Sequence, residues 1–133
     1  MNARIVITVS CWLVLAGLSG LALAGSEPSP LINYQGVLRD ADDRPLEGGR
    51  DMIFRFYDAP SGGSECLVDE HLTSGTGDVL MSGGMFNVAL GSGNVYDGGG
   101  AGFYIDLAEV FRDYTEVHVE VQIYNVLGRK LRT

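Results

Sequence analysis

E-V-H-V-E-V-Q-I-Y, residues 116–124, is the stretch that decides the fold. Branched apolar residues take every second position from Val117 to Ile123, and polar residues lie between them. Because successive side chains of a strand point to opposite faces, this alternation predicts a half-buried β-strand. A helix would scatter the branched residues around its circumference, and a strand buried on both faces would not tolerate Glu116 and Glu120. The other segments are therefore interpreted as partners of this strand.

Several further segments alternate apolar and polar residues or are bounded by turn formers, and these are predicted to be strands. They are residues 31–38, 51–57, 65–73, 76–81 and 85–90, with the start of another at 129–133. The side chains expected to point inward are Met52, Phe54, Phe56, Phe86, Val88 and Leu90. Turn-forming residues fill the connections 40–49, 58–64 and 125–128, and the glycine-rich segment 91–102 predicts a loop. Gly36 interrupts the first strand, which indicates a bulge or a close backbone approach.

One short segment has helical periodicity instead. Leu107, Val110 and Phe111 fall at positions i, i+3 and i+4, and Asp106 is a residue that can cap the helix start. A helix is therefore predicted over residues 106–113. About six or seven short strands with one short helix predict an all-β fold, and the spacing of the turns favours an antiparallel β-sandwich.

The N-terminal segment, residues 1–24, is predicted to be a secretory signal peptide in helical form. After Arg4 it is uncharged, and it ends in Ala22-Leu23-Ala24, the small-x-small pattern read by a signal peptidase, so cleavage is expected before Gly25. The alternative is an N-terminal membrane anchor, because about twenty apolar residues can span a bilayer. The polar run that follows Ala24 favours cleavage.

Export determines the expected organisation and location of the chain. After cleavage, residues 25–30 form a short, stiff leader with two prolines, and residues 31–133 form a single β-sandwich domain. We expect the protein to be secreted, in the extracellular space or on the cell surface, with the periplasm as the other location that a signal peptide allows. No membrane partner is expected once the signal has been removed.

The chain is acidic, with a formal net charge of −8. Loss of Arg4 with the signal leaves 8 basic against 17 acidic residues, a net charge of −9. Such a chain is repelled by phosphates, so we expect no nucleic-acid partner, and solubility is the simplest reason for the acidity. Cys66 is the one cysteine of the cleaved chain, so no internal disulfide can form. We expect Cys66 to be a small buried group, with an intermolecular bridge or a reactive thiol as the alternative.

The sequence contains none of the common catalytic motifs. Segment 91–102 lacks the spacing of a nucleotide-binding loop, and neither Gly-x-Ser-x-Gly nor His-Glu-x-x-His occurs. We therefore expect no enzyme, no catalytic residue and no cofactor. His118 is expected on the solvent face, where a polar role is favoured over metal ligation. No metal site is expected, and Asp40, Asp42 and Asp43 are kept only as candidate oxygen ligands of a loop-type Ca²⁺ site.

Most of the chain resembles a known kind of domain. Residues 32–40 (I-N-Y-Q-G-V-L-R-D), 44–48 (R-P-L-E-G) and 52–63 (M-I-F-R-F-Y-D-A-P-S-G-G) resemble the N-terminal β-domain of large bacterial exported and cell-surface proteins. The likeness continues through residues 84–91 (G-M-F-N-V-A-L-G) and 117–123 (V-H-V-E-V-Q-I). Many of those proteins end in fibre or endosialidase-type chaperone domains. The resemblance implies a part of a larger protein and supplies no catalytic residues.

A second, local resemblance covers residues 123–133, I-Y-N-V-L-G-R-K-L-R-T. This segment is similar to the opening strands of the C-terminal sorting domain of type IX secretion. Both kinds of domain normally continue beyond this point. The two resemblances therefore imply that the β-sandwich domain is truncated at its C-terminus.

Two functions follow as hypotheses. The first is a secreted, non-enzymatic structural or interaction module of a larger extracellular or cell-surface protein. Its partners would be other protein chains or downstream domains, bound through a sheet edge, and an unpaired edge would also promote self-association. The second is a ligand-binding β-sandwich module for carbohydrate or Ca²⁺, which would use the glycine-rich segment and the acidic turns.

Overall fold

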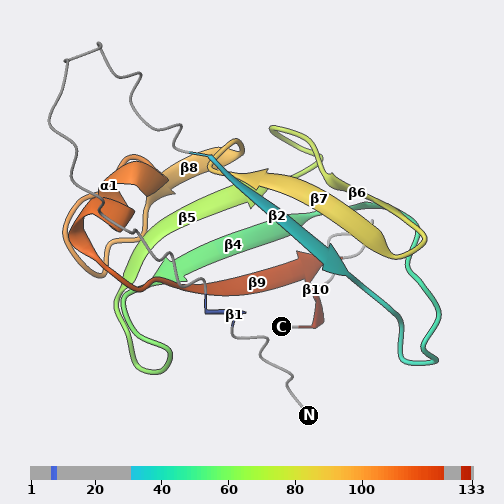
Figure 1. Cartoon of the computed structure of the whole chain (residues 1–133). Coiled ribbons are helices and arrows are strands. Elements are labelled where there is room, and N and C mark those ends of the chain that lie inside the picture. The colour runs from blue at the N-terminus through green and yellow to red at the C-terminus, as the bar shows by residue number, and fades with distance from the viewer. Residues whose placement is uncertain (1–6, 9–30, 125–129, 133) are drawn as a thin grey trace, which may run out of the picture.

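The computed structural model describes residues 7–8, 31–124 and 130–132, which form two antiparallel sheets and one short helix (Figure 1). The elements are β1 (Ile7–Thr8), β2 (Ile32–Val37), β3 (Gly48–Arg50), β4 (Met52–Tyr57), β5 (Glu65–His71), β6 (Val79–Ser82), β7 (Met85–Leu90), β8 (Asn94–Asp97), α1 (Leu107–Asp113), β9 (His118–Tyr124) and β10 (Lys130–Arg132). The mostly β fold with a sandwich-like pair of sheets was predicted from the sequence.

The larger sheet, here sheet A, has the strand order β1-β9-β4-β5-β8, and β10 also pairs with β9. The smaller sheet, sheet B, has the order β2-β7-β6-β3. Without β1 and β10, the short strands nearest the chain ends, each sheet has four strands. This is more strands than the six or seven predicted. Figure 1 shows β2 and β7 crossing in front of β4, β5 and β9, with α1 at one end beside β5 and β8.

The core lies between the two sheets. Met52, Phe54 and Phe56 of β4 are fully buried, as predicted, and face the inward side chains of β2 and β7. An aromatic contact connects the sheets, because the ring of Tyr34 meets that of Phe54 edge-on at a centroid distance of 5.8 Å. On its other side Tyr34 contacts Phe86, also at 5.8 Å. Large apolar groups from alternate positions of several strands therefore form one continuous core.

Helix α1 forms as its sequence predicts. The carboxylate of Asp106 accepts a hydrogen bond from the backbone N–H of Glu109 at 2.9 Å, which caps the first turn. Leu107 and Val110 are buried against the core, and Phe111 packs beside them. The helix therefore covers one end of the sandwich, where β5 also lies.

Two short strands lie where turns or loops were predicted. Residues 94–97 of the glycine-rich segment form β8, which pairs with β5, and residues 48–50 form β3, which pairs with β6. Both strands are too short, and too close to glycines, for an alternation of apolar and polar residues to be recognised in the sequence. Each strand is stabilised by the strand with which it pairs in the sheet. The third strand ends at His71 rather than 73, and the fourth runs over Val79–Ser82 rather than 76–81.

The prediction that His118 projects into solvent is wrong, since its side chain is only 9% exposed. Alternation shows which residues share a face but not whether that face is covered. His118 has neighbours on both sides, Tyr57 of β4 and Thr8 of β1, so it lies within the sheet and not at an open margin. The helix predicted for the signal segment is also wrong at Ile7 and Thr8, which form β1. The rest of that segment and the turn at 125–128 lie outside the described residues.

Gly36 occupies a position where a side chain would collide with an aromatic ring. The pairing of β2 with β7 has no bulge, and a Cβ atom at Gly36 would lie 2.5 Å from the ring of Phe86. Gly36→Ala is therefore expected to lower the free energy of unfolding by roughly 1–3 kcal/mol, because the ring must leave its packed position. Chemical denaturation measures this. Gly75→Ala is the control, because a Cβ atom there meets its nearest neighbour only at 3.9 Å, and equal losses in both variants would contradict the explanation.

Candidate interaction surfaces

The outer face of sheet B has no charged residue on three of its four strands. Strands β2, β7 and β6 read I-N-Y-Q-G-V, M-F-N-V-A-L and V-L-M-S. Their inward positions are buried or half-buried, so the alternate positions form the outer face. We call this set of outward residues the neutral face: Asn33, Gln35, Val37, Leu80, Ser82, Met85 and Asn87.

Three large apolar side chains are exposed on the neutral face. Val37 is 57% exposed, Leu80 72% and Met85 64%. Val37 lies directly opposite Met85 across β2 and β7, and Met85 lies opposite Ser82 of β6, two residues from Leu80. The apolar groups are therefore neighbours and form a connected patch rather than scattered single exposures.

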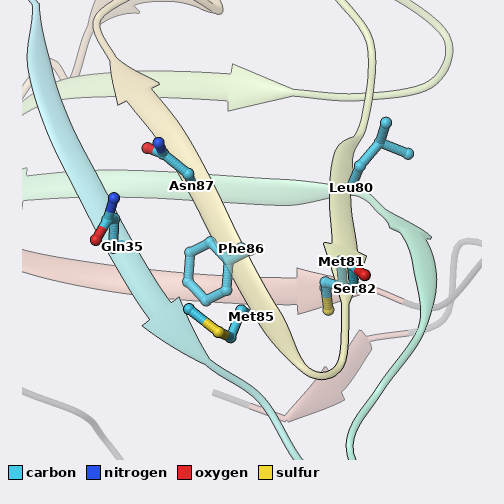
Figure 2. Close-up of a pocket in the computed structure, with 7 residues that line it drawn as sticks. All are labelled: Gln35, Leu80, Met81, Ser82, Met85, Phe86 and Asn87. Atoms are coloured by element: carbon cyan, nitrogen blue, oxygen red, sulfur yellow. The ribbon is translucent and has the colours of Figure 1, made fainter.

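A shallow pocket of about 480 Å³ lies on this side of sheet B (Figure 2). Figure 2 shows Gln35 on β2 and Asn87 on β7 at one side of the pocket, with Leu80 on β6 across from them. The ring of Phe86 and the side chain of Met85 also line it. The pocket thus combines amide groups, which form directional hydrogen bonds, with apolar side chains.

Sheet A has a different outer surface, which carries charged and phenolic groups. Arg55 of β4 donates to both carboxylate oxygens of Glu65 at 3.2 and 3.0 Å, and the hydroxyl of Tyr57 donates to the same carboxylate at 3.0 Å. Farther along, the hydroxyl of Tyr96 donates to Glu70 at 2.7 Å. These groups satisfy one another, which leaves little unpaired charge to hold an external ligand.

The phenols of Tyr57 and Tyr96 are poor acids in this setting. Burial, and then the hydrogen bond to Glu65, raises the pKa of Tyr57 to about 12, and burial with the hydrogen bond to Glu70 does the same for Tyr96. Neither phenol is therefore a nucleophile or a proton acceptor near neutral pH.

These raised pKa values predict how stability changes at alkaline pH. Because the folded protein favours the protonated phenols, their contribution is fully present below pH 10, the ordinary pKa, and is lost as pH rises towards 12. We expect phenolate absorbance of the folded protein to show a step near pH 12 that shrinks in Tyr96→Phe. The prediction fails if Tyr96→Phe removes a step near pH 10 instead.

The three candidate calcium ligands form a turn rather than a cluster. Asp40 accepts hydrogen bonds from the backbone N–H groups of Asp42 and Arg44, both at 2.9 Å, while Asp42 pairs with the guanidinium of Arg44 at 2.9 Å. Asp43 adopts a left-handed conformation with φ 62°, which aspartate tolerates in turns. The carboxylates of Asp40 and Asp42 are thus engaged in shaping the turn. Among the described residues, no group of three His, Cys, Asp or Glu side chains is arranged to hold a metal ion.

A buried acid that was not among the residues predicted from the sequence connects β5 to the glycine-rich segment. Asp69 is fully buried, and its carboxylate accepts hydrogen bonds from the backbone N–H groups of Gly91 at 2.6 Å and Gly93 at 3.0 Å. The Nε2 atom of His71 lies 3.0 Å from the same carboxylate. The carboxylate is therefore surrounded by donors and serves to hold the turn after β7. Alternation along β5 places Asp69 inward, a signal that could have identified it.

Cys66 is free and buried, as predicted. Burial raises the pKa of its thiol, so the thiolate that would react as a nucleophile is disfavoured at neutral pH. The predicted cleavage residues Ala22, Ala24 and Gly25 lie outside the described residues. Within the described part of the chain, none of the helices has the length and apolar character needed to cross a membrane.

Comparison with known proteins gives one match. The model of a family described as "Domain of unknown function (DUF8740)" matches residues 33–130, which is most of the chain. The match begins in β2 and ends at the start of β10, so it includes α1 and both sheets except β1 and most of β10. No curated protein and no solved structure is detectably similar to the chain.

Proposed function

We propose that this chain, which belongs to the family described as "Domain of unknown function (DUF8740)", is an exported, non-enzymatic interaction module. It docks another protein chain on the neutral face and forms part of a larger extracellular or cell-surface assembly. The single observation that supports this proposal is the neutral face itself, a connected apolar patch on strands without charge in a chain of net charge −8.

The chemistry of the neutral face suits a protein partner. Interface centres are depleted of charged residues and enriched in methionine, because a charge that loses its water must be compensated by the partner. Val37, Leu80 and Met85 provide apolar area that water now covers, and its burial would favour association. The exposed amides of Asn33 and Asn87 can set the orientation of the partner through hydrogen bonds. Outside this face, charge repulsion between acidic chains opposes nonspecific association.

A carbohydrate ligand is the second candidate function, and one observation favours it. The amides of Gln35 and Asn87 line the pocket beside the ring of Phe86, and amides next to an aromatic ring are suited to sugar hydroxyls and C–H groups. Phe86 is buried, however, so most of its ring is unavailable for stacking. A rise in melting temperature with a glycan panel would favour this function, since a ligand that binds only the folded state stabilises it.

Charge placed on the neutral face is expected to abolish docking. In Leu80→Lys/Met85→Lys, the two exposed apolar side chains are replaced by charged ammonium groups, for which the partner has no compensating charge. Gel filtration of an epitope-tagged full-length chain from its own cells should then show the protein leaving the high-mass fraction, while its melting temperature stays unchanged.

Phe103→Lys/Ile105→Lys is the matched control, because Phe103 is 75% and Ile105 61% exposed and the charge change is the same. This control should remain in the high-mass fraction. Co-fractionation of Leu80→Lys/Met85→Lys with the assembly at the wild-type level would refute docking through the neutral face.

A further inference from the structure

The outer edge of β9 is covered by two short strands from opposite ends of the chain. Strand β1 pairs with its first part, with Ile7 opposite Val119 and Thr8 opposite His118. Strand β10 pairs with its last part, opposite Ile123 and Tyr124. Figure 1 shows both short strands on the side of β9 away from β4. Because β1 belongs to the predicted signal peptide, cleavage before Gly25 would remove the strand that covers Val119.

Backbone geometry shows which groups this removal would expose. The N–H of Tyr124 donates to the carbonyl of Asp51 at 2.9 Å, so Tyr124 bonds towards β4. In an antiparallel strand, alternate residues bond to opposite neighbours, and the pairing of β4 with β9 is regular. The N–H and C=O groups of Val119 and Val121 therefore point to the outer edge. Without β1, this edge presents backbone donors and acceptors ready to pair with another strand.

We propose that, in the exported chain, β9 pairs antiparallel with β9 of a second copy, with the two-fold axis at Val119. This inference rests on the proposed export, because the pairing replaces β1. The register places Val119 opposite its own counterpart and residue 117 opposite residue 121. It stops before Ile123, where β10 already occupies the edge.

Charge and hydrogen bonding favour this register. It places His118 of each copy directly opposite Glu120 of the other, and an opposite-charge or hydrogen-bonded cross-strand pair is stabilising. With β1 in place, the Nδ1 atom of His118 is buried and, within the described part of the chain, has no hydrogen-bond partner. The carboxylate of Glu120 in the second copy would supply an acceptor for it. Two such pairs form per dimer.

The other sheet edges are less suited to this pairing. Strands β8 and β3 have four and three residues, and short edge strands resist association. Strand β2 has six residues and is the competing edge. Among the described residues, the outer edge of β9 already pairs with a strand from elsewhere in the chain, at Val119, which shows that this edge accepts another strand. Strand β2 pairs with β7 alone, so its outer edge gives no such indication.

Paired cysteines can test the register directly. The full chain carrying His118→Cys/Glu120→Cys is expressed in an exporting host, and the secreted product is oxidised and analysed without reductant. Residues 118 and 120 of opposite copies form directly opposed pairs whose side chains approach closely, so a covalent dimer is expected. Asn33→Cys/Gln35→Cys on β2 is the matched control, with the same spacing on the competing edge, and should remain monomeric. The buried Cys66 is common to both.

The outcomes separate the pairing from the export. Light scattering of the secreted wild-type chain should give a dimer, and mass spectrometry should give a chain that begins at Gly25. A chain that begins at Gly25 but is monomeric overturns the β9 pairing alone. A covalent dimer of the β2 control in place of the β9 variant also overturns it. A secreted chain that keeps Ile7 and Thr8 overturns the predicted cleavage and, because β1 then still covers Val119, overturns the pairing with it.

Discussion

Phe54→Ala is expected to lower the free energy of unfolding by about 4 kcal/mol, because it removes a large, fully buried ring from the core. Phe54 is fully buried at the centre of β4 and contacts side chains from both sheets. Its ring meets Tyr34 of sheet B at 5.8 Å and His71 of the neighbouring strand at 5.7 Å, in both cases edge-on. Removal of the ring therefore leaves a cavity between the two sheets.

Equilibrium chemical denaturation of the wild type and of Phe54→Ala measures the loss in the free energy of unfolding. Phe103→Ala is the control, since Phe103 is 75% exposed and its truncation should change the free energy of unfolding by no more than about 0.5 kcal/mol. A loss at Phe54 as small as that at Phe103 would mean that the sheets do not pack on each other through this ring.

Asp69→Ala is expected to lower the free energy of unfolding by roughly 3 kcal/mol, because it leaves the N–H groups of Gly91 and Gly93 without their charged acceptor. The carboxylate also holds the turn closely, since a Cβ atom at Gly93 would lie 2.4 Å from it. We expect faster hydrogen exchange at the N–H groups of Gly91 and Gly93 as well as the loss of stability.

Asp51→Ala is the matched control for Asp69. The carboxylate of Asp51 also accepts two hydrogen bonds from a loop, from the N–H and hydroxyl of Thr73, each at 2.7 Å, but these lie at the surface. Water can replace them, so a loss of about 1 kcal/mol or less is expected. Equal losses in the two variants would show that burial of Asp69 has no special effect.

Much of the core could be predicted because its strands alternate cleanly. Met52, Phe54 and Phe56 lie on one face of β4, and the inward residues of β7 follow the same rule, so periodicity alone located both. Helix α1 was predicted for a similar reason, since Asp106 and the i, i+3, i+4 spacing are local signals. A local sequence pattern predicts an element correctly when the segment's own preference agrees with the structure that its neighbours in the fold require.

The sequence could not reveal features that depend on distant pairing. Strand β8 exists because Val95 and Tyr96 lie against β5. Tyr96 pairs with Val68, which is 28 residues earlier in the chain, and glycines flank the four residues of β8. Likewise, the burial of His118 depends on strands on both sides of β9. The absence of charge from β2, β6 and β7 was visible, but only the sheet order brings those strands together into the neutral face.

Site-specific photo-crosslinking tests the central claim most directly, namely that the neutral face docks another protein chain. A photoreactive amino acid replaces Leu80 in the full-length chain in its own cells, and a second chain carries it at Asn94, which is exposed on sheet A. We predict that irradiation links position 80 to one discrete partner chain and that Leu80→Lys/Met85→Lys, expressed in its place, is absent from the assembly. Crosslinks to a partner from position 94 with none from position 80 would contradict this account.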